Sequence, residues 1–107
     1  MELVCSLALI GTTPVLQVSG EIDLATLPYF RDQLLRAVSL HGRATLFVDL
    51  DGVTVMDDTG LGILLGTAGR AREQGGDVVV VSTNEQLLAR FDLTRLNEAM
   101  EVRTSIS

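Results

Sequence analysis

The 107-residue sequence predicts an α/β fold in which helices pack on a small mixed β-sheet of four to five strands. Residues 44–50 and 77–81 are apolar, β-branched runs of the kind found in interior strands, which are often parallel. A helical pattern lies between these runs, and a strand, a crossover helix and a second strand form a right-handed βαβ unit. No repeat or linker interrupts the chain, so we expect one domain over residues 1–107.

The N-terminal part of the chain predicts a β-hairpin followed by a helix. Residues 3–10 and 15–18 are apolar strand segments separated by turn residues. The helix begins near Thr26, a residue suited to the N-cap, and Pro28 fits the first turn because its missing amide hydrogen would be unpaired there. It ends at residues 41–42, and its apolar face comprises Leu27, Phe30, Leu34, Ala37 and Val38.

The remaining elements follow from the same periodicity. The helix between the two interior strands ends at Gly75–Gly76, and its buried stripe comprises Leu61, Leu64, Leu65, Ala68 and Ala71. Residues 84–91 predict a third helix, residues 94–99 a helical turn and residues 101–105 a last strand.

The amino-acid composition disfavours several classes of function. The net charge of -6 disfavours nucleic acid and anionic membranes as partners, because both need basic patches, but it suits a basic protein partner. Cys5 is the one cysteine, which fits a reducing compartment, and the N-terminus shows no signal-peptide pattern, so we expect a cytoplasmic protein. His41 is the one histidine, so no catalytic grouping of histidine with a nucleophile stands out, and we expect no enzyme.

The most informative segment is Val53-Thr54-Val55-Met56-Asp57-Asp58-Thr59-Gly60-Leu61-Gly62. A strand runs into two carboxylates where a helix starts, and either carboxylate can accept hydrogen bonds from the unpaired helix amides, with support from the helix dipole. Glycine inside a helix costs up to about 1 kcal/mol relative to alanine. Close packing or docking must therefore offset part of the cost of four glycines at positions 60, 62, 66 and 69.

Four elements resemble the anti-sigma factor antagonist family of STAS domains. Residues 56–62 resemble its phosphorylation loop, Met-Asp-Ser-Ser/Thr-Gly-Leu-Gly, and residues 20–23 resemble its Gly-Glu-Leu-Asp element. Gly75–Gly76 falls where the family has Gly-Gly after the helix, and residues 90–96 resemble its Phe-Asp-x-Thr-Gly-Leu segment. The four occur in the family's order and span almost the whole chain, so the resemblance implies the STAS fold.

The resemblance also implies a role in regulation of transcription by partner switching. In this family the unmodified antagonist binds an anti-sigma factor, which is a serine protein kinase, and frees the sigma factor. Phosphorylation of one serine breaks the complex. Phosphate adds roughly -1.5 to -2 charge, and a misplaced like charge at an interface costs several kcal/mol. We expect this protein to need no cofactor and no metal.

The sequence departs from the family pattern at the phosphoacceptor itself, where Asp58 replaces serine. Three alternatives follow: Asp58 imitates the phosphorylated state, or it makes a constitutive antagonist that a kinase cannot silence, or Thr59 has become the acceptor. A second departure places Arg95 where the family has glycine.

We therefore predict a partner-binding surface at this corner, with Asp58 and Thr59 as its regulatory positions. Ile63, Thr67 and Arg70 lie off the buried stripe, so we expect them to be exposed. The predicted partner-binding residues are Asp23, Asp57, Asp58, Thr59, Gly60, Gly62, Ile63 and Thr67.

Other interpretations of the same residues stay open. Asp57 and Asp58 can serve as helix caps alone. Together with Asp23 they could hold Mg²⁺, but turn chemistry explains them with fewer assumptions, and we expect no metal. A different function class is a non-enzymatic STAS subunit of a larger assembly, such as a stress-sensing complex or a lipid transporter. Binding of a small anion at the helix N-terminus conflicts with the acidic loop.

Overall fold

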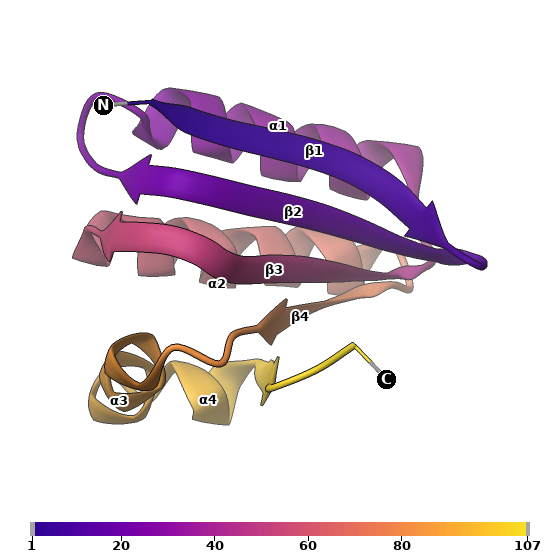
Figure 1. Ribbon diagram of the computed structural model, residues 1–107. Coiled ribbons are helices and arrows are strands. Elements are labelled where there is room, and N and C mark those ends of the chain that lie inside the picture. Colours follow the sequence, from indigo (N-terminus) through magenta and orange to yellow (C-terminus); the bar gives the residue numbers. More distant parts are fainter. Residues whose placement is uncertain (1, 107) are drawn as a thin grey trace.

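The computed structural model describes residues 2–106 as a five-stranded sheet with helices α1 and α2 covering one face (Figure 1). The predicted α/β fold with a mixed sheet is confirmed. The elements in chain order are β1 (Leu3–Ile10), β2 (Thr13–Ile22), α1 (Leu27–Leu40), β3 (Thr45–Met56), α2 (Asp58–Glu73), β4 (Asp77–Val81), α3 (Glu85–Leu93), α4 (Leu96–Ala99) and β5 (Glu101–Arg103).

The strands lie in the sheet in the order β1-β2-β3-β4-β5, which is also their order in the chain. β1 and β2 form the predicted antiparallel hairpin, and the later neighbours are all parallel, joined by helical crossovers. The interior strands β3 and β4 are therefore parallel, as their unbroken apolar runs predict. The last strand is shorter than the predicted segment 101–105 and ends at Arg103.

β3 is much longer than the predicted strand, which covered residues 44–50. It continues to Met56 because residues 53–56 pair with the end of β2, where Ile22 lies opposite Met56. A register shift between Gly20 and Glu21 lies within this pairing, and Gly20 has a φ of +112°, which glycine adopts without strain. The extra pairing carries the chain directly to the corner that contains the two carboxylates.

The main core lies between the sheet and helices α1 and α2, and α3 and α4 add Leu87, Phe91 and Leu96 to it. All five residues of the predicted apolar face of α1 are buried. In α2 the prediction was wrong at one position, because Leu65 is 38% exposed. Thr67 is buried instead, since the arc of α2 that contacts the sheet and α1 is centred near Leu64 and Ala71, and Leu65 lies beyond its edge.

A second, smaller cluster lies on the opposite face of the sheet, with Ile106 packed against its edge. The guanidinium of Arg103 also lies over the Phe47 ring, 5.5 Å from its centroid. The buried members of this cluster are Val15, Phe47, Val79 and Val81.

Arg95 keeps the backbone conformation that the family's glycine would favour. It is the one non-glycine residue with a positive φ among residues 2–106, with φ +60° and ψ 24°. It directly precedes α4, so the substitution leaves the left-handed turn between α3 and α4 in place.

Candidate functional site

The candidate site is the corner where β3 ends and α2 begins. The amide of Asp57 donates to the carbonyl of Ile22 at 2.8 Å, which fixes the corner beside the end of β2. Asp57 is the N-cap of α2, and its carboxylate accepts the amide of Thr59 at 2.8 Å. The backbone and hydroxyl hydrogen bonds from Thr59, and the charge of Arg90, hold the pKa of Asp57 below its usual range. The predicted capping role therefore falls to Asp57.

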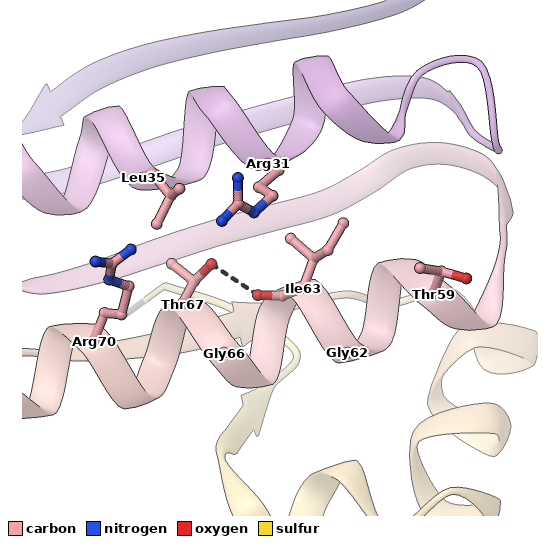
Figure 2. Close-up of a pocket in the computed structure, with 8 residues that line it drawn as sticks. All are labelled: Arg31, Leu35, Thr59, Gly62, Ile63, Gly66, Thr67 and Arg70. Carbon is pink, nitrogen blue, oxygen red and sulfur yellow. Dashed lines mark hydrogen bonds between the residues drawn. The ribbon is translucent and has the colours of Figure 1, made fainter.

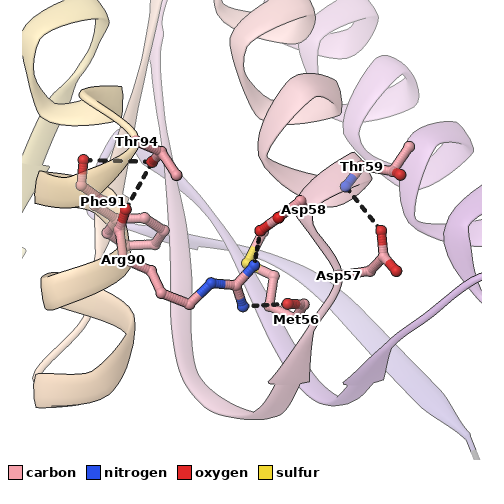
Figure 3. A network of polar contacts seen from close by, with 7 residues as sticks. All are labelled: Met56, Asp57, Asp58, Thr59, Arg90, Phe91 and Thr94. Atoms are coloured by element: carbon pink, nitrogen blue, oxygen red, sulfur yellow. Dashed lines mark hydrogen bonds and ion pairs between the residues drawn. The ribbon is translucent and has the colours of Figure 1, made fainter.

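Asp58 has a different partner, which comes from α3. Its side chain is 82% exposed and forms an ion pair with Arg90 (Figure 3). The same guanidinium donates to the carbonyl of Met56, so Arg90 joins the end of β3 and the start of α2 to α3. This arrangement balances the charge of Asp58 within the chain.

The sequence does not reveal the role of Arg90. It lies 32 residues from Asp58 in the chain, and no local pattern shows that α3 returns to this corner. The one available signal is that Arg90 directly precedes the family-like Phe-Asp segment, which was interpreted as a family element and not as part of the site.

Asp58 and Thr59 face different neighbours, although they are adjacent in sequence. Asp58 points toward Arg90 and α3 in Figure 3, whereas Thr59 points away from them. Thr59 is exposed and lies at one end of the groove between α2 and α1 (Figure 2). The two predicted regulatory positions thus belong to two different surfaces.

Asp23 lies in the loop between β2 and α1, beside Ile22, and is half-buried. Its carboxylate accepts the amides of Ala25 and Thr26, each at 3.0 Å, and so shapes this loop. Thr26 precedes α1 as predicted, but its side chain does not cap the helix; its hydroxyl donates to the carbonyl of Glu21 at 2.7 Å. The structure brings Asp23 near the corner but gives its carboxylate a structural role.

Two of the predicted partner-binding residues are buried, which contradicts their expected exposure. A Cβ on Gly60 would lie 3.0 Å from Ile22 and 3.2 Å from Met56, so this glycine allows α2 to pack on the strand ends. Thr67 is 2% exposed, and its hydroxyl donates to the carbonyl of Ile63 at 2.7 Å. Both positions lie on the arc of α2 that faces the protein interior, so they support the surface from below.

The other predicted residues of α2 border a groove between α1 and α2, with a volume of about 360 Å³. Gly62 is exposed and Ile63 is half-buried, and a Cβ added at Gly62 or Gly66 would meet nothing within 4 Å. The groove is lined by Arg31, Leu35, Thr59, Gly62, Ile63, Gly66, Thr67 and Arg70, as Figure 2 shows.

Residues 2–106 contain no group of three acidic, histidine or cysteine side chains arranged to hold a metal ion. Over the same residues, none of the helices combines the length and apolar character needed to cross a membrane.

Comparisons with known proteins agree with this fold. The family model described as STAS domain matches residues 6–107. The anti-sigma-B factor antagonist of Bacillus subtilis (strain 168) is 34% identical over 85 residues, which cover 79% of this chain and 76% of that protein. That of Staphylococcus aureus (strain NCTC 8325 / PS 47) is 28% identical over 86 residues, 80% of this chain and 79% of that protein.

A solved structure is also similar. The crystal structure of an anti-sigma factor antagonist from Mycobacterium paratuberculosis superimposes with a TM-score of 0.88 at 25% identity, covering 98% of this chain and 88% of that chain. The family model spans residues 6–107, and the solved structure covers 98% of this chain. The chain therefore belongs to the STAS domain family, and its relatives are anti-sigma factor antagonists.

Proposed function

We propose that this protein is a cytoplasmic, non-enzymatic anti-sigma factor antagonist. It binds an anti-sigma factor of the serine-kinase type and so releases a sigma factor. The observation that carries the proposal is the α2 corner, because the family's phosphoacceptor position is occupied by Asp58 and is 82% exposed. A partner that docks there meets the side chain at this position directly.

The contact surface that we propose is the exposed part of the predicted set. Asp58 and Thr59 present their side chains at the corner, and Gly62 and Ile63 continue the surface along α2. Asp23 and Asp57 shape the two loops that meet there, and buried Gly60 and Thr67 hold α2 against the core. Asp23 and Asp57, which form no ion pair among residues 2–106, keep the corner acidic beside the paired Asp58, and this charge suits a basic patch on the partner.

We further propose that Asp58 makes the antagonist constitutive. A carboxylate has no hydroxyl to phosphorylate, and it carries one charge where phosphoserine carries roughly -1.5 to -2. Arg90 pairs with that one charge, so the corner does not present the excess negative charge of a phosphorylated relative. Thr59 lies on the groove side of the corner, away from Arg90, and is not the acceptor in this proposal.

A pull-down with the anti-sigma factor kinases of the source genome tests the function. Wild type and Asp58→Ser are both expected to bind one of these kinases. Incubation with ATP should release Asp58→Ser, with one phosphate detected by mass spectrometry, and leave wild type bound and unmodified. Glu73→Ser, at the exposed far end of α2, is the matched control and should behave as wild type.

Two outcomes would contradict the proposal. If neither wild type nor Asp58→Ser binds any of the kinases, the antagonist role is wrong. Co-purification with a membrane complex in place of a kinase would then favour a STAS subunit of a larger assembly. A phosphate on Thr59 of wild type would overturn the constitutive role and restore a switch.

A further inference from the structure

We infer that the groove between α1 and α2 is a second docking site, which takes an acidic amphipathic helix of the anti-sigma factor. The inference rests on the proposed function for the identity of the partner, but the groove itself is defined by this chain alone. It runs along α2 from Thr59, next to the corner, to Arg70 in the last turns of the helix (Figure 2).

The charge of the groove is opposite to that of the corner. Arg31 reaches into it from α1 and Arg70 from α2, and both are exposed (Figure 2). Neither forms an ion pair within residues 2–106; the arginines that do are Arg72, Arg90, Arg95 and Arg103. Asp32, the acidic residue next to Arg31 in α1, borders the adjoining hollow without pairing with it. Two uncompensated cations therefore flank the groove in a chain whose net charge is -6.

Aliphatic side chains lie between these cations. Leu35 and Ile63 line the groove and are half-buried. An adjoining hollow of about 380 Å³ shares Arg31 and Ile63 with it and extends to Leu24, which is 76% exposed. An apolar floor with charged walls is the surface that an amphipathic helix recognises, with apolar anchors in the groove and charges at its sides.

The groove also has room for a partner helix to approach α2 closely. The spaces beside Gly62 and Gly66 are open, because a Cβ at either position would meet nothing within 4 Å. Each glycine favours the helix less than alanine would, and among residues 2–106 no close neighbour requires a glycine at either position, in contrast to Gly60. A partner helix that contacts this surface would use the space.

The corner and the groove together form a surface with opposite charges at its two ends. Its negative end lies at the corner, where Asp23 and Asp57 form no ion pair among residues 2–106, and its positive end lies at Arg70, with Thr59 at the junction. A partner helix fits one way only, with carboxylates opposite Arg31 and Arg70 and with basic groups toward the corner. The groove thus selects a helix by the sign of its charges as well as by its apolar anchors.

The first experiment measures the affinity of the anti-sigma factor for charge-reversed variants. Arg31→Glu combined with Arg70→Glu should weaken binding by about tenfold or more, and the loss should shrink at high salt because ions screen exposed charges. Arg36→Glu is the matched control, because Arg36 is an exposed α1 arginine outside the groove. Its affinity should stay within about twofold of wild type. Equal losses in the double variant and the control would overturn the inference.

The second experiment needs no anti-sigma factor. Two synthetic helical peptides share the same leucine stripe, and one carries glutamates where the other carries lysines. In an NMR titration of ¹⁵N-labelled protein, the glutamate peptide should shift the amide signals of Gly62, Ile63 and Gly66, and the lysine peptide should not. No shift, or equal shifts by both peptides, would show that the groove does not select acidic helices. If the kinase pull-down fails and this titration succeeds, only the antagonist role is wrong.

Discussion

Arg90 of α3 forms an ion pair with Asp58 and donates a hydrogen bond to the carbonyl of Met56. The guanidinium of Arg90, which lies 32 residues after Asp58 in the chain, thus connects the end of β3 and the first residue of α2 to α3. The contact joins the proposed regulatory position to a distant element, so the charge balance at Asp58 depends on where α3 holds Arg90.

A double-mutant cycle on Arg90 and Asp58 should give a small but positive coupling. The carboxylate is 82% exposed, so we expect about 0.5 kcal/mol between the two side chains. Arg90→Ala alone should destabilise the protein more than Asp58→Ala, because it also frees the Met56 carbonyl. Urea denaturation of wild type, both single variants and the double variant measures the coupling. Strictly additive effects would mean that the ion pair contributes nothing.

The same arginine provides a test of the constitutive role in binding. Arg90→Gln leaves the charge of Asp58 unbalanced, so it should weaken binding of the anti-sigma factor, in the direction of a phosphorylated relative. In the Asp58→Ser background the same substitution should have a smaller effect, because no carboxylate is left to unbalance. Calorimetric titration of the four proteins with the anti-sigma factor gives the comparison; equal losses in both backgrounds would contradict the role assigned to the pair.

Two glycines of α2 should respond in opposite ways to alanine. Gly60→Ala should lower the free energy of unfolding by about 1 kcal/mol, because the new methyl group is crowded by Ile22 and Met56. Gly66→Ala should raise it by up to about 1 kcal/mol, because the space there is open and alanine favours the helix. Thermal denaturation of both variants provides the measurement. A stabilising Gly60→Ala would show that α2 does not need close contact with the strand ends.

Because of Asp57, the free energy of unfolding should depend on pH in the acid range. Its folded-state pKa is lowered by the hydrogen bonds from Thr59, so the native state binds fewer protons than the unfolded state in the acid range. The stabilisation is complete above the usual aspartate value of 3.8 and is lost as the pH falls through the lower folded value. The stability difference between wild type and Asp57→Ala should therefore shrink as the pH falls below 3.8. A difference that stays constant over this range would contradict the capping role.

Cys5 should react slowly with thiol reagents at neutral pH. Burial raises the pKa of its thiol to about 11, so little of the reactive thiolate is present. The alkylation rate with iodoacetamide should keep increasing as the pH rises toward 10, and at pH 7.5 it should be far faster in urea than in buffer. Equal rates in urea and in buffer would show that β1 does not shield the thiol.

Local patterns predicted most of the fold. The hairpin, the buried face of α1 and the parallel strands β3 and β4 follow from periodicity and turn residues within short windows. The second half of β3 was missed because Asp51 and Gly52 interrupt its apolar run, and its pairing with the end of β2 is a long-range contact. No window of the sequence contains that contact.

The candidate site shows the same limit. The helix start and a capping carboxylate could be predicted, because a carboxylate pair before a helix is a local signal, but the structure was needed to show that Asp57 and not Asp58 is the cap. Thr67 was expected to be exposed and Leu65 to be buried, because leucine is the more apolar residue. Burial in α2 depends instead on which side of the helix faces α1 and the sheet, and that side contains Thr67. Arg90 was missed because its partners come from two other elements.

The matching order of strands in the sheet and in the chain bears on how the protein is made. Each new strand pairs with the one synthesised just before it, so every strand after β1 finds its sheet neighbour already synthesised. The residues of the corner at the start of α2 are synthesised before α3, so Arg90 is the last part of this contact to leave the ribosome. During synthesis there is thus an interval in which Asp58 is already presented and its counter-charge has yet to arrive.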